Sequence, residues 1–274
     1  MTVESLESIY INITFFTVVI SSIFYLISLV KKQNKLFMKI AYISMIAGFI
    51  SITMVLIFRT ILSGHDPLSN FFESMIFMIW GSFLIFLFIM SKYKSVFIGI
   101  TMTPFICIMM GMASILPQEW KEIRPLMPAL QSYWLKIHVS TVMISYSSFV
   151  LSVVTAIVFL IFLKKEKSDE NEKFLKMYDE LTYRLILFGF PLLGFGIISG
   201  AIWANYAWGS YWSWDPKEVS ALMTWLFYAA YLHARHTNTW SGKTSAIIAI
   251  IGFLALIFTY YGVNYLPGLH SYGF

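Results

Sequence analysis

Eight long apolar segments account for most of this 274-residue chain. Each segment has about 20 residues or more, which is the length that a helix needs to cross the hydrocarbon core of a bilayer. Hydrophobic residues make up 58% of the sequence and charged residues 12%, whereas a soluble globular chain has about 25% charged residues. This composition excludes a soluble enzyme, a disordered tail and a nucleic-acid-binding protein. The segments cover about residues 9–30, 38–62, 71–91, 95–115, 135–163, 181–203, 218–237 and 244–264.

These segments predict an all-α fold, a polytopic membrane bundle of about eight transmembrane helices. We expect residues 1–274 to form a single integral membrane domain, because little chain remains for a soluble one. The first segment follows Glu4 and Glu7 instead of a basic region, so we expect a retained helix and not a cleaved signal peptide. The single cysteine, Cys107, allows no intrachain disulfide.

The basic residues are unequally divided between the two sides of the predicted bundle. One set of alternate loops holds 14 of the 19 Lys and Arg residues. Because cytoplasmic loops carry the excess of Lys and Arg, both termini are predicted to lie on the outer side. The same rule predicts four outer segments, at 63–70, 116–134, 204–217 and 265–274. The five outer basic residues are Arg59, Lys121, Arg124, Lys136 and Lys217.

Two helix starts can be recognised in the outer loops. Asn70 and Glu73 have the spacing of a capping box, in which each side chain bonds the other residue's backbone N–H group. Asp215-Pro-Lys-Glu218 is a stronger signal, because proline also occupies the first helical position.

Two glycines, Gly196 and Gly200, are four residues apart in the sixth apolar segment. This spacing places both on one helix face, where the absence of side chains lets a neighbouring helix approach closely. We interpret them as packing features.

The outer loop at about 203–218 is rich in tryptophan and tyrosine. Three of the nine tryptophans fall between Trp208 and Trp214. An aromatic belt at the membrane interface explains one or two such residues, but it explains this cluster poorly. Exposed indoles suit a flat, apolar ligand, and their N–H groups can hold a carboxylate at its rim. The candidate cofactor-binding residues are Trp208, Tyr211, Trp212, Trp214 and Asp215, with Trp203 at the start of the loop.

Two of the five histidines are predicted on the same side as this loop. His138 lies one turn into the fifth segment, and His270 lies in the outer tail. Neutral imidazoles are common metal ligands. Two of them near a tryptophan platform suggest axial ligation of a haem iron. His65 and His236 are interpreted as surface histidines.

His233 lies about 15 residues into the seventh segment, about 20 Å below the outer end. An ionisable group at that depth indicates a functional site. His236 shares its helix face and therefore fails to supply the opposite axial ligand. A methionine, a water molecule or a partner protein must complete the coordination of a metal at His233.

Several motifs together resemble the CcsA-type (ResC-type) cytochrome c biogenesis proteins of the WWD haem-handling family. The loop WGSYWSWDPKE, starting at Trp208, matches the tryptophan-rich signature of that family. The flanking helix WLFYAAYLHAR contains His233, and the segments LKIHVS and LPGLHSYG contain His138 and His270. The segment GHDPLSNFFES resembles the first outer loop of the family.

The resemblance implies a role in attaching haem b covalently to apocytochrome c outside the bacterial cytoplasmic membrane, or on the lumenal side of the thylakoid. His138 and His270 match the external axial ligands, and His233 matches one intramembrane ligand. In that family the second intramembrane ligand belongs to a CcsB-type (ResB-type) partner or to a fused half, and this chain lacks that half. Two alternatives follow for attachment: this chain is part of a holocytochrome c synthase together with the partner, or it only carries haem to the partner. The CxxCH motif of apocytochrome c is then expected to receive the haem at the Trp loop.

Two other functions are considered beside this one. A secondary transporter of another substrate would need a coupling-ion relay, and the spans show no mid-membrane acids or arginines to form one. A HemX-type regulator of haem synthesis has a similar length, but the two external histidines argue against it. The candidates for holding the haem propionates are Lys217, Arg124, Lys121 and Lys136. Asp215 and Glu218 are equally explained by helix capping.

Overall fold

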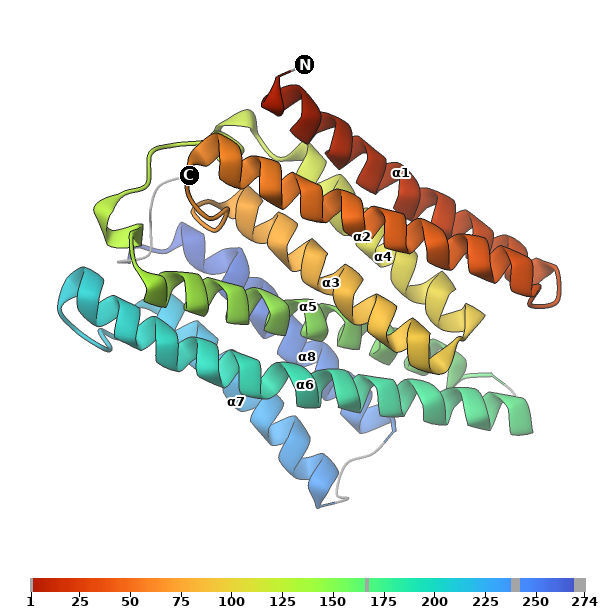
Figure 1. Cartoon of the computed structure of the whole chain (residues 1–274). Coiled ribbons are helices and arrows are strands. Elements are labelled where there is room, and N and C mark those ends of the chain that lie inside the picture. The colour runs from red at the N-terminus through yellow and green to blue at the C-terminus, as the bar shows by residue number, and fades with distance from the viewer. Residues whose placement is uncertain (1, 166–167, 238–241, 269–274) are drawn as a thin grey trace. The chain divides into compact units, whose positions relative to one another are not determined.

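The computed structural model describes residues 2–165, 168–237 and 242–268, and this part of the chain forms eight α-helices (Figure 1). Every predicted apolar segment is helical, which confirms the predicted all-α fold. The helices are α1 (Val3–Val30), α2 (Lys35–Ser63), α3 (Phe71–Tyr93), α4 (Val96–Ile115), α5 (Tyr133–Phe162), α6 (Asp169–Trp208), α7 (Pro216–His236) and α8 (Lys243–Tyr260). Three short 3-10 turns are η1 (Gln118–Trp120), η2 (Pro128–Leu130) and η3 (Gly262–Tyr265).

Seven of the eight described helices are long and apolar enough to cross a membrane. The exception is α7, a helix of 21 residues. Its sequence begins with Pro-Lys-Glu and contains two tyrosines and two histidines, so its mean hydropathy falls below that of the other helices. Because the other seven helices have the length and composition of membrane-spanning helices, the chain is an integral membrane protein.

The helix α6 is much longer than its predicted apolar segment at 181–203. It has 40 residues, which corresponds to about 60 Å, twice the thickness of a hydrocarbon core. The added first turns are polar, and the Ser168 hydroxyl caps them by accepting a hydrogen bond from the Asn171 N–H at 3.2 Å. A search for apolar residues misses this extension because it contains few of them.

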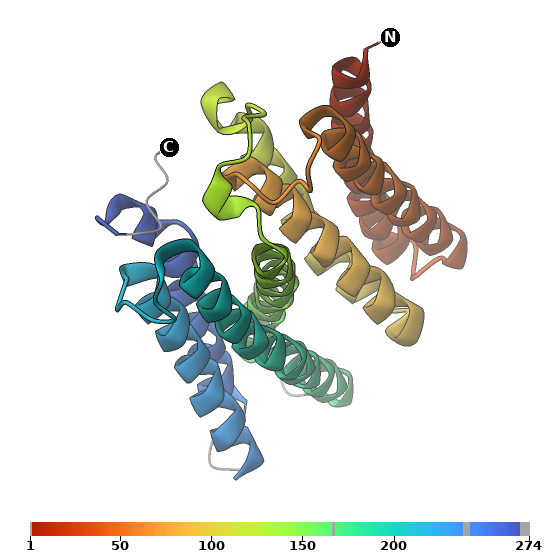
Figure 2. The same cartoon turned by 60° about the vertical axis from the view of Figure 1, so that its left-hand side comes forward.

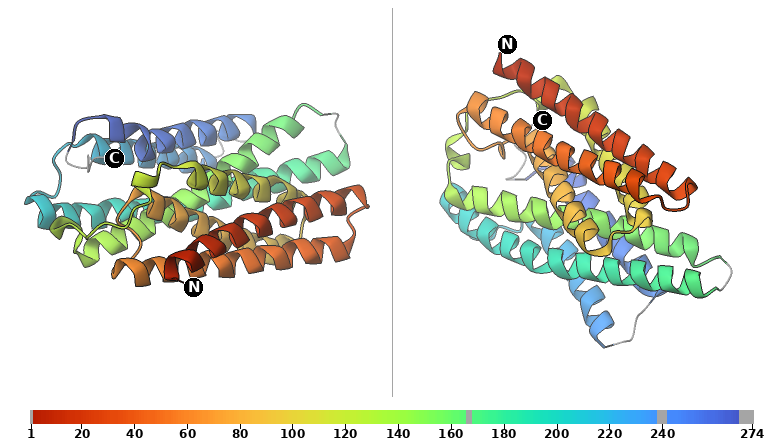
Figure 3. Two further views of the ribbon diagram at one scale, coloured as in Figure 1. Left: turned by 90° about the horizontal axis from the view of Figure 1, so that it is seen from above. Right: turned by 45° about the vertical axis from the view of Figure 1, so that its right-hand side comes forward.

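The chain divides into two compact units, residues 1–128 and 129–274. In the first unit, α1 packs along α2 and α4, and α3 packs against the same two helices (Figure 2). In the second unit, α5 packs along α6 and contacts α8, while α7 packs against α8 and α6 (Figure 3). The expectation that residues 1–274 work as a single haem-handling domain stays a prediction.

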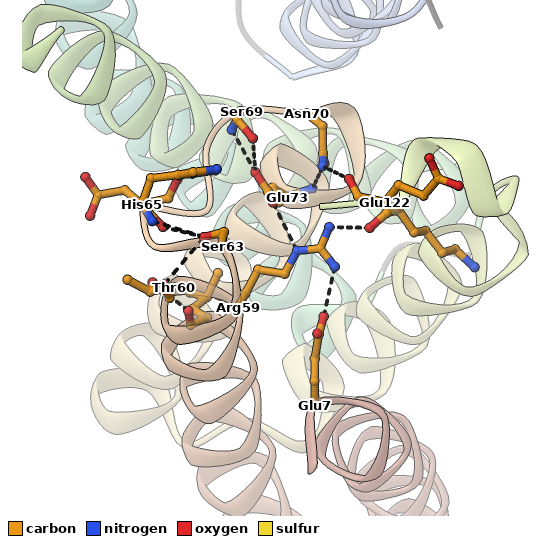
Figure 4. A network of polar contacts seen from close by, with 12 residues as sticks. Glu7, Arg59, Thr60, Ser63, His65, Ser69, Asn70, Glu73 and Glu122 are labelled. Carbon is orange, nitrogen blue, oxygen red and sulfur yellow. Dashed lines mark hydrogen bonds and ion pairs between the residues drawn. The ribbon is translucent and has the colours of Figure 1, made fainter. Parts of the chain in front are cut away.

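A buried ion-pair network joins three helices of the first unit (Figure 4). The Arg59 Nε and Nη1 atoms donate to Glu73 Oε1 at 3.0 Å and to Glu7 Oε1 at 3.1 Å. The Nη2 atom donates to the backbone carbonyl of Lys121. These three charged residues are 1–8% exposed. Arg59 is one of the predicted outer basic residues, and its burial between two carboxylates was not predicted.

This network changes the interpretation of the α3 start. The Asn70 Oδ1 atom accepts from the Glu73 N–H at 2.9 Å, as the capping-box prediction requires. The Glu73 carboxylate, however, bonds the Ser69 N–H at 2.8 Å and its hydroxyl at 2.7 Å, and it pairs with Arg59. The bond to the Ser69 N–H through Oε2 therefore takes the place of the reciprocal half of the predicted capping box, while Oε1 forms the ion pair.

Candidate functional site

His138 lies in the second turn of α5 and is held by the backbone of α6. Its Nδ1 atom lies 2.7 Å from the carbonyl oxygen of Gly196. A carbonyl oxygen only accepts hydrogen bonds, so Nδ1 carries the proton and the neutral ring keeps its lone pair on Nε2. Histidines that bind metals commonly have this arrangement, because a hydrogen bond at one nitrogen orients the other.

Gly200 provides the space in which this imidazole lies. A Cβ atom at position 200 would lie 2.6 Å from Nδ1 and 2.7 Å from Cε1 of His138. A Cβ atom at Gly196 would lie 2.5 Å from Val142 Cγ2 instead. The predicted close approach of a neighbouring helix is confirmed, since both contacts are with α5. The spacing of the two glycines does not by itself indicate that Gly200 accommodates the histidine.

Two tryptophans extend from His138 along the end of α6. The Trp203 ring is stacked with the imidazole at a centroid distance of 6.4 Å and an interplanar angle of 11°. Trp203 is 2% exposed, and its Nε1–H donates to the Ala129 carbonyl at 2.8 Å. Trp208 meets Trp203 edge-on at 4.9 Å. The predicted site residue Trp208 is therefore connected to His138 through Trp203, which was predicted as part of the aromatic cluster and not as a binding residue.

The rest of the loop presents aromatic rings to its surroundings. Tyr211 is 60% exposed, and Trp214 is 76% exposed. Trp212 lies between them in sequence and meets Trp214 edge-on at 5.9 Å. Trp214 also has a φ of +60°, and such a left-handed conformation costs a bulky residue about 1–3 kcal/mol. Strain of this kind clusters at ligand sites, so the exposed Trp214 is a candidate contact for a ligand.

Asp215 performs the capping predicted for it. Its Oδ1 atom accepts from the Lys217 N–H at 2.9 Å, and the Glu218 carboxylate accepts from the Asp215 N–H at 3.2 Å. A Cβ atom at Gly268 would lie 2.5 Å from Asp215 Oδ2, so the chain after α8 lies against this cap. The predicted ligand His270 follows two positions later and lies outside the described residues.

Of the four predicted propionate-binding cations, Lys217 has the best surroundings. Its Nζ atom donates to Asn264 Oδ1 at 3.3 Å, and its charge acts electrostatically on His138. Burial lowers the pKa of the Lys217 amine, and the neighbouring Asp215 carboxylate opposes this shift. The other three are engaged elsewhere: Lys121 with the Ser114 carbonyl, Arg124 with Glu122, and Lys136 with the Tyr133 ring.

His233 lies near the end of α7, and its side chain is exposed. His236 is exposed as well, while His65 is half-buried and its Nδ1 atom lies 3.0 Å from the Asp66 carbonyl oxygen. Within the described ranges, no three His, Cys, Asp or Glu side chains gather in a way that suits a metal ion. A haem iron needs only one or two axial side chains, so His138 and the exposed His233 stay predicted ligands.

Comparison with known proteins identifies one family. The cytochrome c assembly protein family matches residues 68–270. The chain is 44% identical to the cytochrome c biogenesis protein CcsA of Guillardia theta, over 96% of this chain and 95% of that protein. It is 43% identical to CcsA of Prochlorococcus marinus, over 82% and 81%. Cytochrome c haem lyase CcmF has the same fold with a TM-score of 0.70 at 14% identity, over 95% of this chain and 47% of CcmF. By these matches, the chain belongs to the cytochrome c assembly protein family.

Proposed function

We propose that this membrane protein works in cytochrome c biogenesis by binding haem b and presenting it to apocytochrome c at the Trp loop, residues 203–218. The observation that carries the proposal is the geometry of His138. Its Nδ1–H is donated to Gly196, so Nε2 is the ring atom left to coordinate iron. The buried Trp203 ring stacked beside it supports the imidazole, and the exposed rings of the loop offer flat apolar surfaces suited to a porphyrin.

The loop residues provide the remaining contacts that a haem requires. Trp208, Tyr211, Trp212 and Trp214 offer aromatic faces, of which Tyr211 and Trp214 are the most exposed. Lys217 is the cation suited to a propionate, because a half-buried ammonium forms a strong charge-assisted hydrogen bond with a carboxylate. Asp215 takes part by fixing the start of α7 and hence the position of Lys217. His270 is proposed as the second external ligand on the strength of its motif alone.

Attachment itself joins two substrates. The thiols of the apocytochrome CxxCH motif add across the haem vinyl groups. For each thiol, the S–H bond and the π bond of the vinyl C=C are broken, a C–S and a C–H bond form, and no atom is lost. This chain contributes positioning: the histidine holds the iron and the aromatic loop orients the ring edge. Holding two reactants in the correct geometry is a large part of catalysis for a joining reaction.

His233 is proposed as one ligand of a separate haem site in the membrane. Its exposure is consistent with a second ligand from a CcsB-type partner, because an exposed imidazole is open to another protein. We expect His233→Ala to lower the haem content of the purified complex without preventing its assembly. Visible absorption spectra of the chain with and without the partner measure this. A chain that holds low-spin haem with two histidine ligands at this site without its partner would contradict the partner ligand, and a complex with no haem absorbance would favour a transporter of another substrate.

The Trp loop is proposed to face the outer side of the bacterial cytoplasmic membrane, or the lumen of a thylakoid, because the opposite loops hold most of the Lys and Arg residues. In a Cys107→Ser background, we expect a cysteine replacing the exposed Ser210 to react with an impermeant thiol reagent in intact cells. A cysteine replacing Ser168 should react only after the membrane is permeabilised. The reverse pattern would reject the orientation and the outer site with it.

Gly200→Ala is expected to impair haem handling through His138. The new methyl group would occupy the position of the imidazole, so the ring must turn and lose its bond to Gly196. Loss of such an orienting contact lowers metal affinity by about 10–100-fold, measured here as haem affinity and cytochrome c yield. Gly189→Ala is the matched control, because it meets Phe149 at 2.7 Å on the same helix pair away from His138. Equal losses in both variants would show that the glycines serve helix packing alone.

A further inference from the structure

Three buried polar atoms follow one face of α7 in the second unit. Trp225, Tyr228 and Tyr231 are spaced three residues apart, so they lie along the same helix face. The Trp225 Nε1–H and the hydroxyls of the two tyrosines have no hydrogen-bond partner among the described residues. Both tyrosines are 1% exposed. Because the large majority of buried polar groups in proteins are hydrogen-bonded, three successive exceptions on one face indicate a ligand.

Packing prevents two of these rings, those of Trp225 and Tyr228, from turning toward other partners. The Tyr228 ring is stacked on Phe149 at 3.8 Å and 12°, and the Trp225 ring is stacked on Phe190 at 4.7 Å and 18°. Gly252 closes the other side of Tyr228, since a Cβ atom there would lie 3.0 Å from two ring carbons. Rings clamped between such neighbours keep their polar atoms where they are, and the tight stacking excludes a large ligand.

The polar atoms continue toward an ion pair at the end of α7. The hydroxyl of Tyr228 lies within electrostatic range of the hydroxyls of Tyr146 and Tyr231. The hydroxyl of Tyr231 in turn interacts electrostatically with Asp179 and Arg235. The two charged residues pair at 2.8 Å and are partly exposed, with side chains 23% and 14% accessible. The path from Trp225 to Arg235 thus covers ten helical positions, about 15 Å.

We propose that Trp225, Tyr228 and Tyr231 bind a row of ordered water molecules that extends to the Asp179–Arg235 pair. Water is the ligand that matches the site, because it is small and both donates and accepts hydrogen bonds to buried polar groups. A hydrogen-bonded row ending at a carboxylate gives protons a route between Asp179 and the interior of the unit. The proposal rests on the packing of α7 and is independent of haem binding.

Radiolytic hydroxyl-radical footprinting of the full chain in nanodiscs tests this proposal, because ordered waters generate radicals next to the side chains that hold them. We expect Tyr228 and Tyr231 to be oxidised several-fold faster than Tyr178, which is 0% exposed and whose hydroxyl is not among the unpartnered atoms. Tyr228→Phe removes one anchor for water and should reduce oxidation of Tyr231. Oxidation of Tyr228 and Tyr231 at the rate of Tyr178 or slower would overturn the proposal.

Thermal unfolding of the Tyr→Phe variants gives a second test. The unfolding midpoint should shift in opposite directions for a hydroxyl that binds water and for a hydroxyl that is buried dry. If the hydroxyl binds water, its removal loses a hydrogen bond and lowers the unfolding midpoint by about 2–4 °C. If the hydroxyl is buried dry, its removal relieves an unsatisfied polar group and raises the midpoint. A raised midpoint in both Tyr228→Phe and Tyr231→Phe would contradict the row of waters, and neither substitution changes the size of the ring.

Discussion

His138→Ala is expected to abolish cytochrome c maturation while the membrane protein accumulates normally. The substitution removes the proposed axial ligand of the external haem and leaves the Gly196 carbonyl without its imidazole donor. Loss of a ligand costs more than loss of an orienting contact, so the decrease in mature cytochrome should be about 100-fold or more. Haem staining of c-type cytochromes, together with an immunoblot of this chain, measures both quantities.

Free imidazole should partly restore the function of His138→Ala. The deleted ring leaves a space of its own size between Trp203 and Gly200, and a coordinate bond needs no tether to the backbone. Binding of the free ligand has an entropy cost that the tethered side chain avoids, so rescue should need millimolar imidazole and stay incomplete.

His65→Ala is the control for this experiment. His65 is half-buried, and its backbone contacts with Ser63 persist in the alanine variant, so cytochrome maturation should be unchanged. If His138 were only structural, its loss would lower the protein level, and imidazole would have no effect. Stable His138→Ala protein with normal cytochrome yield and an unchanged haem spectrum would refute the ligand assignment.

The helices were the part of this fold that could be predicted, because long apolar runs leave few alternatives to a membrane-spanning helix. The same signal failed at the polar first turns of α6, where helix formation depends on the Ser168 cap and on charged side chains that a hydropathy search discounts. It also overstated α7, which is helical without being strongly apolar.

The sequence was enough to predict which residue types form the candidate site, but not how those residues contact one another. A tryptophan cluster and His138 on the same predicted side of the membrane could be recognised from their positions alone. The packing of α5 against α6 decides which rings face the histidine. This packing cannot be predicted from the spacing of residues within one segment. For this reason Trp203, buried against His138, was left out of the predicted binding residues, and Gly200 was interpreted as a general packing position.

Arg59 illustrates the same limit for charges. Counting basic residues by loop treats each as an independent solvated charge, which suits the exposed Arg124. The partners of Arg59 are 14 and 52 positions away in the sequence. Only the packing of α1, α2 and α3 brings them together, and the resulting group of three charges has consequences for stability that no composition reveals.

Arg59→Met is expected to destabilise the first unit severely. It removes the cation from between Glu7 and Glu73 and leaves two buried carboxylates without their partner, while it also frees the Lys121 carbonyl. Breaking a buried ion pair by removing one member costs about 3–5 kcal/mol, because the remaining charge is left uncompensated in a poorly solvated position. Detergent-induced unfolding followed by tryptophan fluorescence measures the loss.

Two further variants separate this effect from a loss of packing. Arg124→Met breaks the exposed pair with Glu122, whose side chains are 61% and 51% accessible, and should change stability by about 0–1 kcal/mol. Combining Arg59→Met with Glu7→Gln and Glu73→Gln removes the buried charges together and should recover most of the lost stability, because neutral amides tolerate burial better than unpaired carboxylates. If Arg59→Met were as mild as Arg124→Met, the network would be an ordinary surface feature. If the triple variant were as unstable as Arg59→Met alone, the loss would come from the missing arginine side chain and its packing, and charge burial would not be its cause.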